Sequence, residues 1–579
     1  MITPTKEQQD VLDATGHLLV MGGPGSGKTT IALLKARELI CSGKLLRGQR
    51  VLFLSFARAT IARVEEQATS MLQDCDMSAL EITTYHGFIW NILKNYGYLL
   101  IPHKTRILLP HEASTRLSGI ESETERETEK RRLFYEEGLL HFDLFAEQCA
   151  DLLNRSRALA KIIADAYPYI FLDEFQDTDA HQWELVQRLG QQSTIIALAD
   201  PEQRIYDFRG ADPARIRQYI EALAPLRYDF EAANHRSNGT DIVEFGNDLL
   251  TGDNIAKAQR YHDVHIYSYN PWSTDDGLLT IKSMVLASYK RVSVSNPNWS
   301  IAVLVTSNKT MLDVSEYFGR TTGRMPSIAH EVAIESAGPT IAAILIADLL
   351  DAISRGGCNL ELLIIGLQGH ILGRNGESEK TTKSDQQLAG FLANYLRTRK
   401  EPGKNCKNQK QLLDECSQII EACNAITLSG DVSADWISVR DTFKGKESKS
   451  LQNLLLDASY VKLLHKGSAL SASLNEIWRD SATYKGAAEA VRAALKQEYF
   501  AATTTQPKGI HVMTIHKSKG KEFDEVIIFE GNRTGRFLHG ENYDQTRLNL
   551  RVAVTRAKKH ADILVAKQNP CPLLLPLSI

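Results

Sequence analysis

A glycine-rich stretch near the start of the chain has the residue types and spacing that bind phosphate. It reads Gly22-Gly23-Pro24-Gly25-Ser26-Gly27-Lys28-Thr29, the pattern G-x-x-x-x-G-K-T. Glycine lets backbone N–H groups close around a phosphate where a side chain would collide, and a following helix adds its positive N-terminal end. We expect these residues and Thr30 to bind a nucleotide, with Lys28 at its β- and γ-phosphates and the Thr29 hydroxyl on Mg²⁺.

Two carboxylates form the second chemical signal. The apolar run Tyr169–Leu172 ends in Asp173 and Glu174. An apolar strand that ends in two acids is common by chance, but in a fold with a phosphate-binding loop this strand lies beside the loop. We therefore expect Asp173 to hold Mg²⁺ through water and Glu174 to polarise the attacking water.

The segments after these acids carry a more specific pattern. The acids continue into Phe175-Gln176-Asp177-Thr178-Asp179, and a later segment reads Asp200-Pro201-Glu202-Gln203-Arg204-Ile205-Tyr206-Asp207-Phe208-Arg209-Gly210-Ala211. Together, D-E-F-Q-D-T-D and D-x-x-Q-x-I-Y-x-F-R-G-A resemble the UvrD/Rep/PcrA helicases of superfamily 1. That family usually has Trp where this chain has Phe208, which still offers a ring on which a base can stack.

Other segments match the same family in its own order. Residues 4–9 are similar to its adenine-reading element, 234–237 (N-H-R-S) to its N-Y-R-S element, 514–523 to T-x-H-x-x-K-G-x-E-F and 554–558 to V-T-R-A-K. The resemblance implies ATP and Mg²⁺ as cofactors. It assigns ATP contacts to Gln8, Gln203, Arg236, Gly520, Glu522 and Arg556. Gln203, Arg236 and Arg556 join Lys28, Asp173 and Glu174 as the expected catalytic set, with the two arginines as fingers from a second core. Because ATP would attract cations from both cores, its binding would stabilise closure.

The resemblance also implies contacts with DNA. Residues 55–59 and 84–88 are similar to the family's first two DNA-contact segments. The expected DNA-binding residues are Phe56, Arg58, Thr84, His86, Tyr206, Phe208, Arg209, Thr514 and His516. Tyr85 and Phe88 are further candidate stacking faces, although a single aromatic is more often a core residue.

The function implied is an ATP-dependent DNA helicase and translocase that moves 3′→5′ on single-stranded DNA and also meets duplex DNA. One alternative is an ATPase that senses DNA or nucleotides and licenses a partner nuclease, as in Gabija-type phage defence. A role with a repair or defence partner is compatible with both. An RNA motor is a third hypothesis, which the motifs disfavour.

The elements that must position these residues follow from short apolar runs between helical patterns. Strands are expected over 51–55, 169–172, 194–199, 301–306, 510–514, 525–529 and 561–566. These predict an α/β protein with two parallel-sheet cores, each interrupted by a mostly helical insertion. The family resemblance implies that both cores are RecA-like P-loop motor domains. The N-terminal core is predicted over 1–92 and 166–225, with an insertion over 93–165. The C-terminal core is predicted over 226–340 and 505–579, with an insertion over 341–504.

Composition adds weaker constraints. The 579 residues carry a net charge of −3, so DNA binding must rest on local patches, and residues 501–579 do hold 12 Lys and Arg against 7 Asp and Glu. The basic segment 397–411 is interpreted either as a solvated loop or as a duplex contact.

Eight scattered cysteines suggest reduced thiols in a cytoplasm. An iron–sulfur cluster of Cys406, Cys416, Cys423 and Cys358 is a minor alternative. We expect no signal peptide and no membrane contact, because the apolar run 341–350 is too short to span a bilayer.

Overall fold

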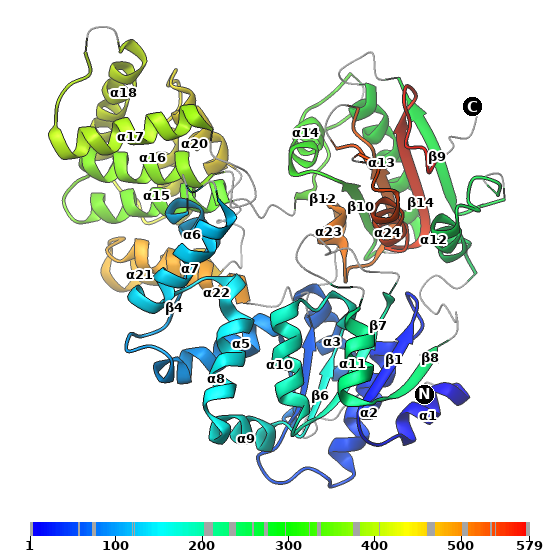
Figure 1. Cartoon of the computed structure of the whole chain (residues 1–579). Helices are drawn as coiled ribbons and strands as arrows, with labels where there is room; N and C mark the ends of the chain where they lie inside the picture. The colour runs from blue at the N-terminus through cyan, green and yellow to red at the C-terminus, as the bar shows by residue number, and fades with distance from the viewer. Residues whose placement is uncertain are drawn as a thin grey trace. The chain divides into compact units, whose positions relative to one another are not determined.

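The chain folds into two compact units. We describe it from a computed structural model whose described residues are 4–55, 58–71, 77–117, 120, 122–201, 212, 214–230, 239–257, 260–270, 276–295, 297–323, 325–332, 337–374, 382–403, 406–459, 469–500, 508–532, 535–538 and 540–574. The first unit comprises Met1–Ile92, Ala146–Ile334 and Ala502–Ile579, and it contains two sheets. The second comprises Leu93–Phe145 and Glu335–Ala501 and is mostly helical (Figure 1).

The first sheet has six parallel strands and carries the phosphate loop. Its order is β3 (Leu80–Thr84), β2 (Val51–Ser55), β6 (Tyr169–Leu172), β7 (Thr194–Ala199), β1 (Leu18–Gly22) and β8 (Leu226–Phe230). Because parallel strands share one carboxyl edge, the segments after β1, β6 and β7 come together there.

Helices cover this sheet on both faces. The helices are α1 (Lys6–Asp13), α2 (Lys28–Cys41), α3 (Arg58–Met71), α5 (Tyr85–Tyr96), α8 (Phe145–Arg155), α9 (Arg157–Ala166), η3 (Phe175–Asp177), α10 (Ala180–Gly190) and α11 (Arg215–Leu223). Leu18, Val20 and Phe53 pack with α1, α2 and α3 on one face, and the alternate residue Leu19 is buried on the other. The Tyr219 hydroxyl donates to two strand carbonyls at 3.1 Å and fixes the last helix to the sheet.

The second sheet is also parallel and six-stranded. Its order is β11 (Glu331–Val332), β12 (Gly509–Thr514), β10 (Ser300–Val305), β13 (Phe523–Phe529), β14 (Ala557–Ala566) and β9 (Val264–Tyr269). One face packs on α12 (Ile242–Thr251) and α24 (Tyr543–Val554), and the other on α13 (Asp276–Ser295) and α14 (Asn308–Gly319). The short α23 (Ile515–Ser518) follows β12 directly.

The helical unit is built from two distant segments. Its buried apolar residues form a large cluster in the second segment and a small one in the first. Helix α6 (Pro110–Arg116) of the first segment packs against α15 (Ala337–Ser354) and α16 (Leu360–Gly373) of the second. The remaining elements are η1 (Gly97–Leu99), β4 (Arg106–Ile107), α7 (Glu123–Glu137), β5 (Leu139–Leu140), η2 (Phe142–Leu144), α17 (Lys383–Thr398), α18 (Lys407–Asn424), α19 (Val432–Asp441), α20 (Lys449–Ser459), α21 (Ala469–Ser481) and α22 (Ala487–Phe500).

Helix α15 lies at the centre of the large cluster. The apolar run 341–350 belongs to a helix of 18 residues, which by length and composition alone could cross a membrane, and the expectation that it is far too short was wrong. More than half of it is buried against α16, α20 and α22, as expected of the core helix of a helical unit. The buried core helix of a helical domain can have the same length and apolar composition as a membrane-spanning helix.

The predicted fold class is confirmed, with two parallel-sheet cores and helical insertions. Several predicted boundaries differ from the structure. Strand β8 pairs with β1, so the first sheet extends beyond residue 225. Helices α8 and α9, predicted within the insertion 93–165, lie almost wholly in the unit of the sheets, where the Arg50 N–H donates to the Ala166 carbonyl at 2.9 Å. The second helical segment runs from 335 to 501.

Candidate nucleotide site

The loop between β1 and α2 has a backbone that requires glycine. Gly25 and Gly27 have φ of 77° and 88°, in the left-handed region that side chains disfavour. A Cβ on Gly22 would lie 2.7 Å from the Ser26 Oγ and 3.1 Å from the Phe230 Cβ. Helix α2 starts at Lys28 without a side-chain cap, so the backbone N–H groups of its first turn face the loop.

Polar groups of this loop fit a bound phosphate. The Ser26 Oγ is buried and has no hydrogen-bond partner among the described residues. A phosphate oxygen would satisfy such a hydroxyl. The Lys28 Nζ donates to the carbonyls of Gly22 and Gly23, the latter at 3.0 Å, so the ammonium lies over the loop. Thr29 and Thr30 are half-buried in the first turn of α2.

Gln8 lies against the same loop. Its Nε2 donates to the Ser26 carbonyl at 3.4 Å, and its Oε1 accepts from the Thr5 N–H at 3.0 Å within a capping box of α1. The side chain therefore holds the start of α1 against the phosphate loop. Its predicted contact with adenine stays a prediction.

The acids expected at the carboxyl end of β6 are in place. Asp173 is buried and accepts from the Ser55 Oγ at 3.3 Å. Glu174 has φ 55° and ψ 38°, a left-handed conformation that is strained for a residue with a Cβ. The Gln176 Nε2 donates to the Glu174 Oε2, and its Oε1 accepts from the Asp200 N–H at 2.9 Å. One amide thus ties the end of β6 to the end of β7.

A cation from the second core lies on these acids. The Lys519 Nζ contacts the Asp177 Oδ2 and lies 3.6 Å from the Glu174 Oε2. Lys519 and Asp177 are buried, and the Glu174 side chain is 21% exposed. Burial by itself raises the pKa of Glu174. The charges of Lys519 and Lys28 and the hydrogen bond from Gln176 outweigh burial and hold that pKa below its usual range. Glu174 is therefore ionised, as a group that accepts a proton from water must be.

Two arginines of the second core, Arg551 and Arg556, lie near the acids at the ends of β6 and β7. The Arg551 Nη1 is 3.8 Å from the Asp200 Oδ1, and its Nη2 donates to the Asn247 Oδ1 at 3.2 Å. Arg556 is 2% exposed, its Nε donates to the Val552 carbonyl at 3.0 Å, and its charge also lowers the pKa of Glu174.

Two further predicted ATP contacts, Gly520 and Glu522, belong to the same segment as Lys519. Gly520 has φ 78°, and the Glu522 Oε2 lies 3.7 Å from the Lys558 Nζ. Sequence reasoning assigned no role to Lys519, Asp177 or Arg551. Lys519 stands inside the quoted T-x-H-x-x-K-G pattern, where its position was a usable signal.

Residues expected to contact DNA have mixed surroundings. The Thr84 Oγ1 accepts from the Gly87 N–H at 3.0 Å at the end of β3, and Thr514 precedes α23 as its N-cap. His86 and His516 are half-buried. Tyr85 and Phe88 are 1% and 3% exposed. The prediction that their rings stack on bases was therefore wrong, and both are core residues. Arg58 begins α3, and its side chain lies outside the described part of the structure.

Two family models match this chain. The UvrD/REP helicase N-terminal domain matches residues 4–133 and 129–223, and the UvrD-like helicase C-terminal domain matches 509–564. Those ranges carry the phosphate loop, the β6 acids and Lys519. Residues 4–223 and 509–564 therefore match domains of UvrD-like helicases.

Curated relatives resemble parts of this UvrD-like chain. The ATP-dependent DNA helicase Rep of Escherichia coli is 26% identical over 291 residues, which cover 43% of this chain and 43% of Rep. The ATP-dependent DNA helicase PcrA of Staphylococcus aureus is 21% identical over 297 residues, 44% and 40% of the two chains. RecBCD subunit RecB of Mycolicibacterium smegmatis is 37% identical over 102 residues, 17% of this chain and 9% of RecB. The chain thus spans less than half the length of each of these relatives.

Among solved structures, Pif1 helicase from Candida albicans matches 43% of this chain at 13% identity. Its TM-score of 0.25 is too low to bear on the fold.

Several expected site residues of this UvrD-like protein lie outside the described residues. They are Phe56, Gln203, Tyr206, Phe208, Arg209 and Arg236. Their assignments stay predictions that rest on the sequence.

The cysteine alternative receives no support. Among the described residues, the one group of His, Cys, Asp or Glu side chains close enough to share a metal ion is His265, His560 and Asp562, which contains no cysteine. Cys416 and Cys423 are instead buried in the apolar core of the helical unit.

Proposed function

We propose that this chain is an ATP-driven DNA translocase and helicase that moves 3′→5′ on single-stranded DNA. One observation carries the proposal: Lys519 of the second core lies on Asp177 and Glu174 beside the phosphate loop of the first core. The residues that hydrolyse a nucleotide thereby depend on both cores. Relatives named ATP-dependent DNA helicases support ATP and DNA as ligands, and the polarity follows from the family.

The residues present fit Mg²⁺-ATP. The loop amides, Ser26 and Lys28 would hold the phosphates, while Thr29 and Asp173 would hold the metal ion. When bound, Mg²⁺ neutralises charge that develops on the phosphate oxygens. Gly520 and Glu522 lie in the second-core motif that would follow the state of the nucleotide.

Glu174 is the proposed base. Its carboxylate is ionised because nearby cations lower its pKa, and Gln176 fixes one of its oxygens by a hydrogen bond. The other oxygen would orient the attacking water, and the strained backbone of Glu174 aims it. Arg236 and Arg556 would act as arginine fingers at the γ-phosphate.

Coupling to DNA follows from the shared site. When the phosphates are present, Lys519 and the fingers would bind across the cores and favour closure. After hydrolysis the closed state loses these contacts. Thr84, His86, Thr514 and His516 end or follow strands of the two sheets, and with Phe56, Arg58 and the segment of Tyr206 to Arg209 they would grip the strand. Gln203 and Phe208 lie five residues apart, so one segment would join nucleotide to base.

The competing hypothesis is an ATPase that senses DNA and licenses a partner nuclease, with little unwinding. One experiment separates the two. Duplexes with a 3′ or a 5′ single-stranded tail are incubated with ATP and the full chain, and strand release is compared with ATP hydrolysis on the same DNA. The helicase hypothesis predicts release of the 3′-tailed duplex, which Glu174→Gln abolishes.

Hydrolysis that DNA stimulates without release of either duplex would favour the sensor. Hydrolysis indifferent to DNA would contradict both hypotheses. Release of RNA duplexes in preference to DNA would instead favour an RNA motor. Because phosphate contacts release counterions, DNA stimulation should also fall as salt rises.

A further inference from the structure

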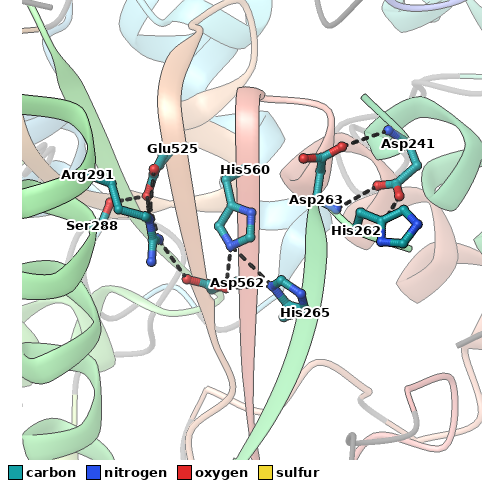
Figure 2. A network of polar contacts seen from close by, with 9 residues as sticks. All are labelled: Asp241, His262, Asp263, His265, Ser288, Arg291, Glu525, His560 and Asp562. Carbon is teal, nitrogen blue, oxygen red and sulfur yellow. Dashed lines mark hydrogen bonds and ion pairs between the residues drawn. The ribbon is translucent and has the colours of Figure 1, made fainter. Parts of the chain in front are cut away.

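A group of polar side chains lies at the amino end of the second sheet, on the face covered by α13. Along β14 the even-numbered residues face that helix. Leu564 and Ala566 belong to its apolar core, whereas His560 and Asp562 lie nearer the strand's start. His265 of β9 pairs in register with Asp562, so strands far apart in sequence bring the three side chains together (Figure 2).

The three side chains point at one another. The His265 Nδ1 is 3.3 Å from the His560 Nε2, which lies 2.9 Å from the Asp562 Oδ1, and the Nδ1 and Oδ1 are 3.8 Å apart. A metal with bonds of about 2.0–2.1 Å to tetrahedral ligands would separate its ligand atoms by about 3.3–3.4 Å. The observed triangle has sides that scatter around that value.

The ring positions agree with the same geometry. Two imidazoles that converge on one tetrahedral ion would have ring centroids about 5.2 Å apart. Rings joined head-on by a linear N–H···N bond of 3.3 Å would have centroids about 5.6 Å apart. The centroids of His265 and His560 are 5.0 Å apart.

Neighbouring groups orient the carboxylate and balance charge. The Arg291 Nη2 lies 3.4 Å from the Asp562 Oδ2, which leaves the Oδ1 for the two rings. Arg291 is itself paired with Glu525, whose Oε2 is 2.7 Å from the same nitrogen and also accepts from the Ser288 Oγ (Figure 2). Because Glu525 matches the charge of Arg291, Asp562 can still attract a cation. A hydrogen bond to a ligating carboxylate is a common support of metal sites.

The group is accessible and separate from the nucleotide site. The side chains of His265, His560 and Asp562 are 31%, 17% and 6% exposed, so solvent can supply a fourth ligand. The three residues lie near the amino ends of their strands, whereas Lys519 follows the carboxyl end of β12. In a parallel sheet these are opposite edges.

We propose that His265, His560 and Asp562 bind one Zn²⁺ ion, with water as the fourth ligand. Two imidazoles and one carboxylate suit zinc, whereas Mg²⁺ prefers oxygen ligands in an octahedral arrangement. The ion would join β9, the edge strand, to β14. The sequence signal is His-x-Asp on one strand with a histidine on its neighbour.

The test uses the full chain treated with a chelator. Co²⁺, a spectroscopic substitute for Zn²⁺, is titrated in, and Zn²⁺ is then added in competition. We expect one equivalent of four-coordinate Co²⁺, shown by its d–d absorption and displaced by Zn²⁺. His265→Ala and His560→Ala should each weaken binding about a hundredfold.

His262→Ala is the matched control, because His262 is exposed three residues before His265 and lies outside the group (Figure 2). It should bind within about twofold of the parent chain. Zn²⁺ should raise the melting temperature of the parent and of His262→Ala, but not of His265→Ala. His265 stands on an edge strand and is partly exposed, so its variant should fold even where His560→Ala does not.

Several results would overturn the proposal. They are less than one equivalent of bound metal, a six-coordinate Co²⁺ spectrum, thiolate charge-transfer bands that report cysteine ligands, or equal affinity in His265→Ala and His262→Ala.

Discussion

The two sheets of the first unit have the same number of parallel strands but opposite charge at the nucleotide site. The first sheet contributes the glycine loop and the carboxylates of Asp173, Glu174 and Asp177, of which Asp173 and Asp177 are buried. The second contributes Lys519, Arg551 and Arg556, and it has no comparable loop among its described residues. The difference teaches that one fold can supply either half of a site.

This division has an energetic consequence. A buried carboxylate without a counter-charge is strongly destabilising. In the first sheet, Lys28 is one counter-charge for Glu174, and Lys519 of the second sheet is another. A nucleotide brings further negative charge to the same cations. The balance between acids and phosphates at Lys519 would therefore link the state of the nucleotide to the contact between the sheets.

The strongest way to break the first half of the site is Lys28→Ala. The loop then loses its ammonium, and we expect ATP hydrolysis to fall by roughly a thousandfold or more. Steady-state phosphate release in the presence of single-stranded DNA measures the effect. Lys44→Ala, an exposed lysine after α2, is the control and should hydrolyse ATP normally. ATP hydrolysis at the parent rate in Lys28→Ala would contradict the assignment of the phosphate loop.

Glu174→Gln tests the base and leaves the phosphate contacts intact. The neutral amide cannot accept a proton from water, so hydrolysis should fall about a hundredfold to ten-thousandfold. Binding of a fluorescent ATP analogue should persist, and the ATP-bound variant should stay on DNA. Hydrolysis at the parent rate would show that another group is the base.

Lys519→Met tests the contribution of the second sheet. A hydrogen bond to a charged group is worth about 1.5–3 kcal/mol, so hydrolysis should fall about tenfold to a hundredfold. Lys567→Met, at an exposed position of the same core, is the matched control. Adding Asp177→Asn should recover thermal stability but not hydrolysis. Full hydrolysis in Lys519→Met would mean that the first sheet works alone.

The same variant has a signature in pH. Lys519 helps to hold the pKa of Glu174 below its usual range, so in the parent the carboxylate stays ionised as the pH falls. Without Lys519 that pKa rises, and the acidic limb of the pH profile should move to higher pH. The measurement is kcat/KM for ATP against pH. If the acidic limb stays at the same pH in Lys519→Met, the charge of Lys519 does not set the pKa of Glu174.

The smallest expected effect distinguishes two roles of Gln8. If Gln8 reads adenine, Gln8→Ala should raise the KM for ATP about twofold to tenfold and reduce the preference for ATP over GTP. If it only holds Ser26 and the start of α1, both nucleotides should lose affinity equally. Comparing KM values for the two nucleotides decides between these outcomes.

Much of the fold could be predicted because buried parallel strands are contiguous apolar runs. Strands β2, β6 and β7 have the predicted bounds, and the strands predicted in the second sheet are each present. Strands at or near the sheet edges escaped prediction. β9 reads Val-His-Ile-Tyr-Ser-Tyr and β8 reads Leu-Arg-Tyr-Asp-Phe, so polar residues interrupt the apolar pattern. An edge strand has one neighbour and tolerates such residues, which weakens its signal.

The sequence by itself determined the local chemistry. The phosphate loop and the Asp173–Glu174 pair are contiguous, so residue type and spacing suffice to predict them. Only the tertiary structure decided which distant segments meet. Lys519 reaches Asp177 across 342 residues, His265 reaches His560 across 295, and α6 packs against α15 and α16. Such contacts arise from strand order and helix packing, which the spacing of residues along the chain does not encode.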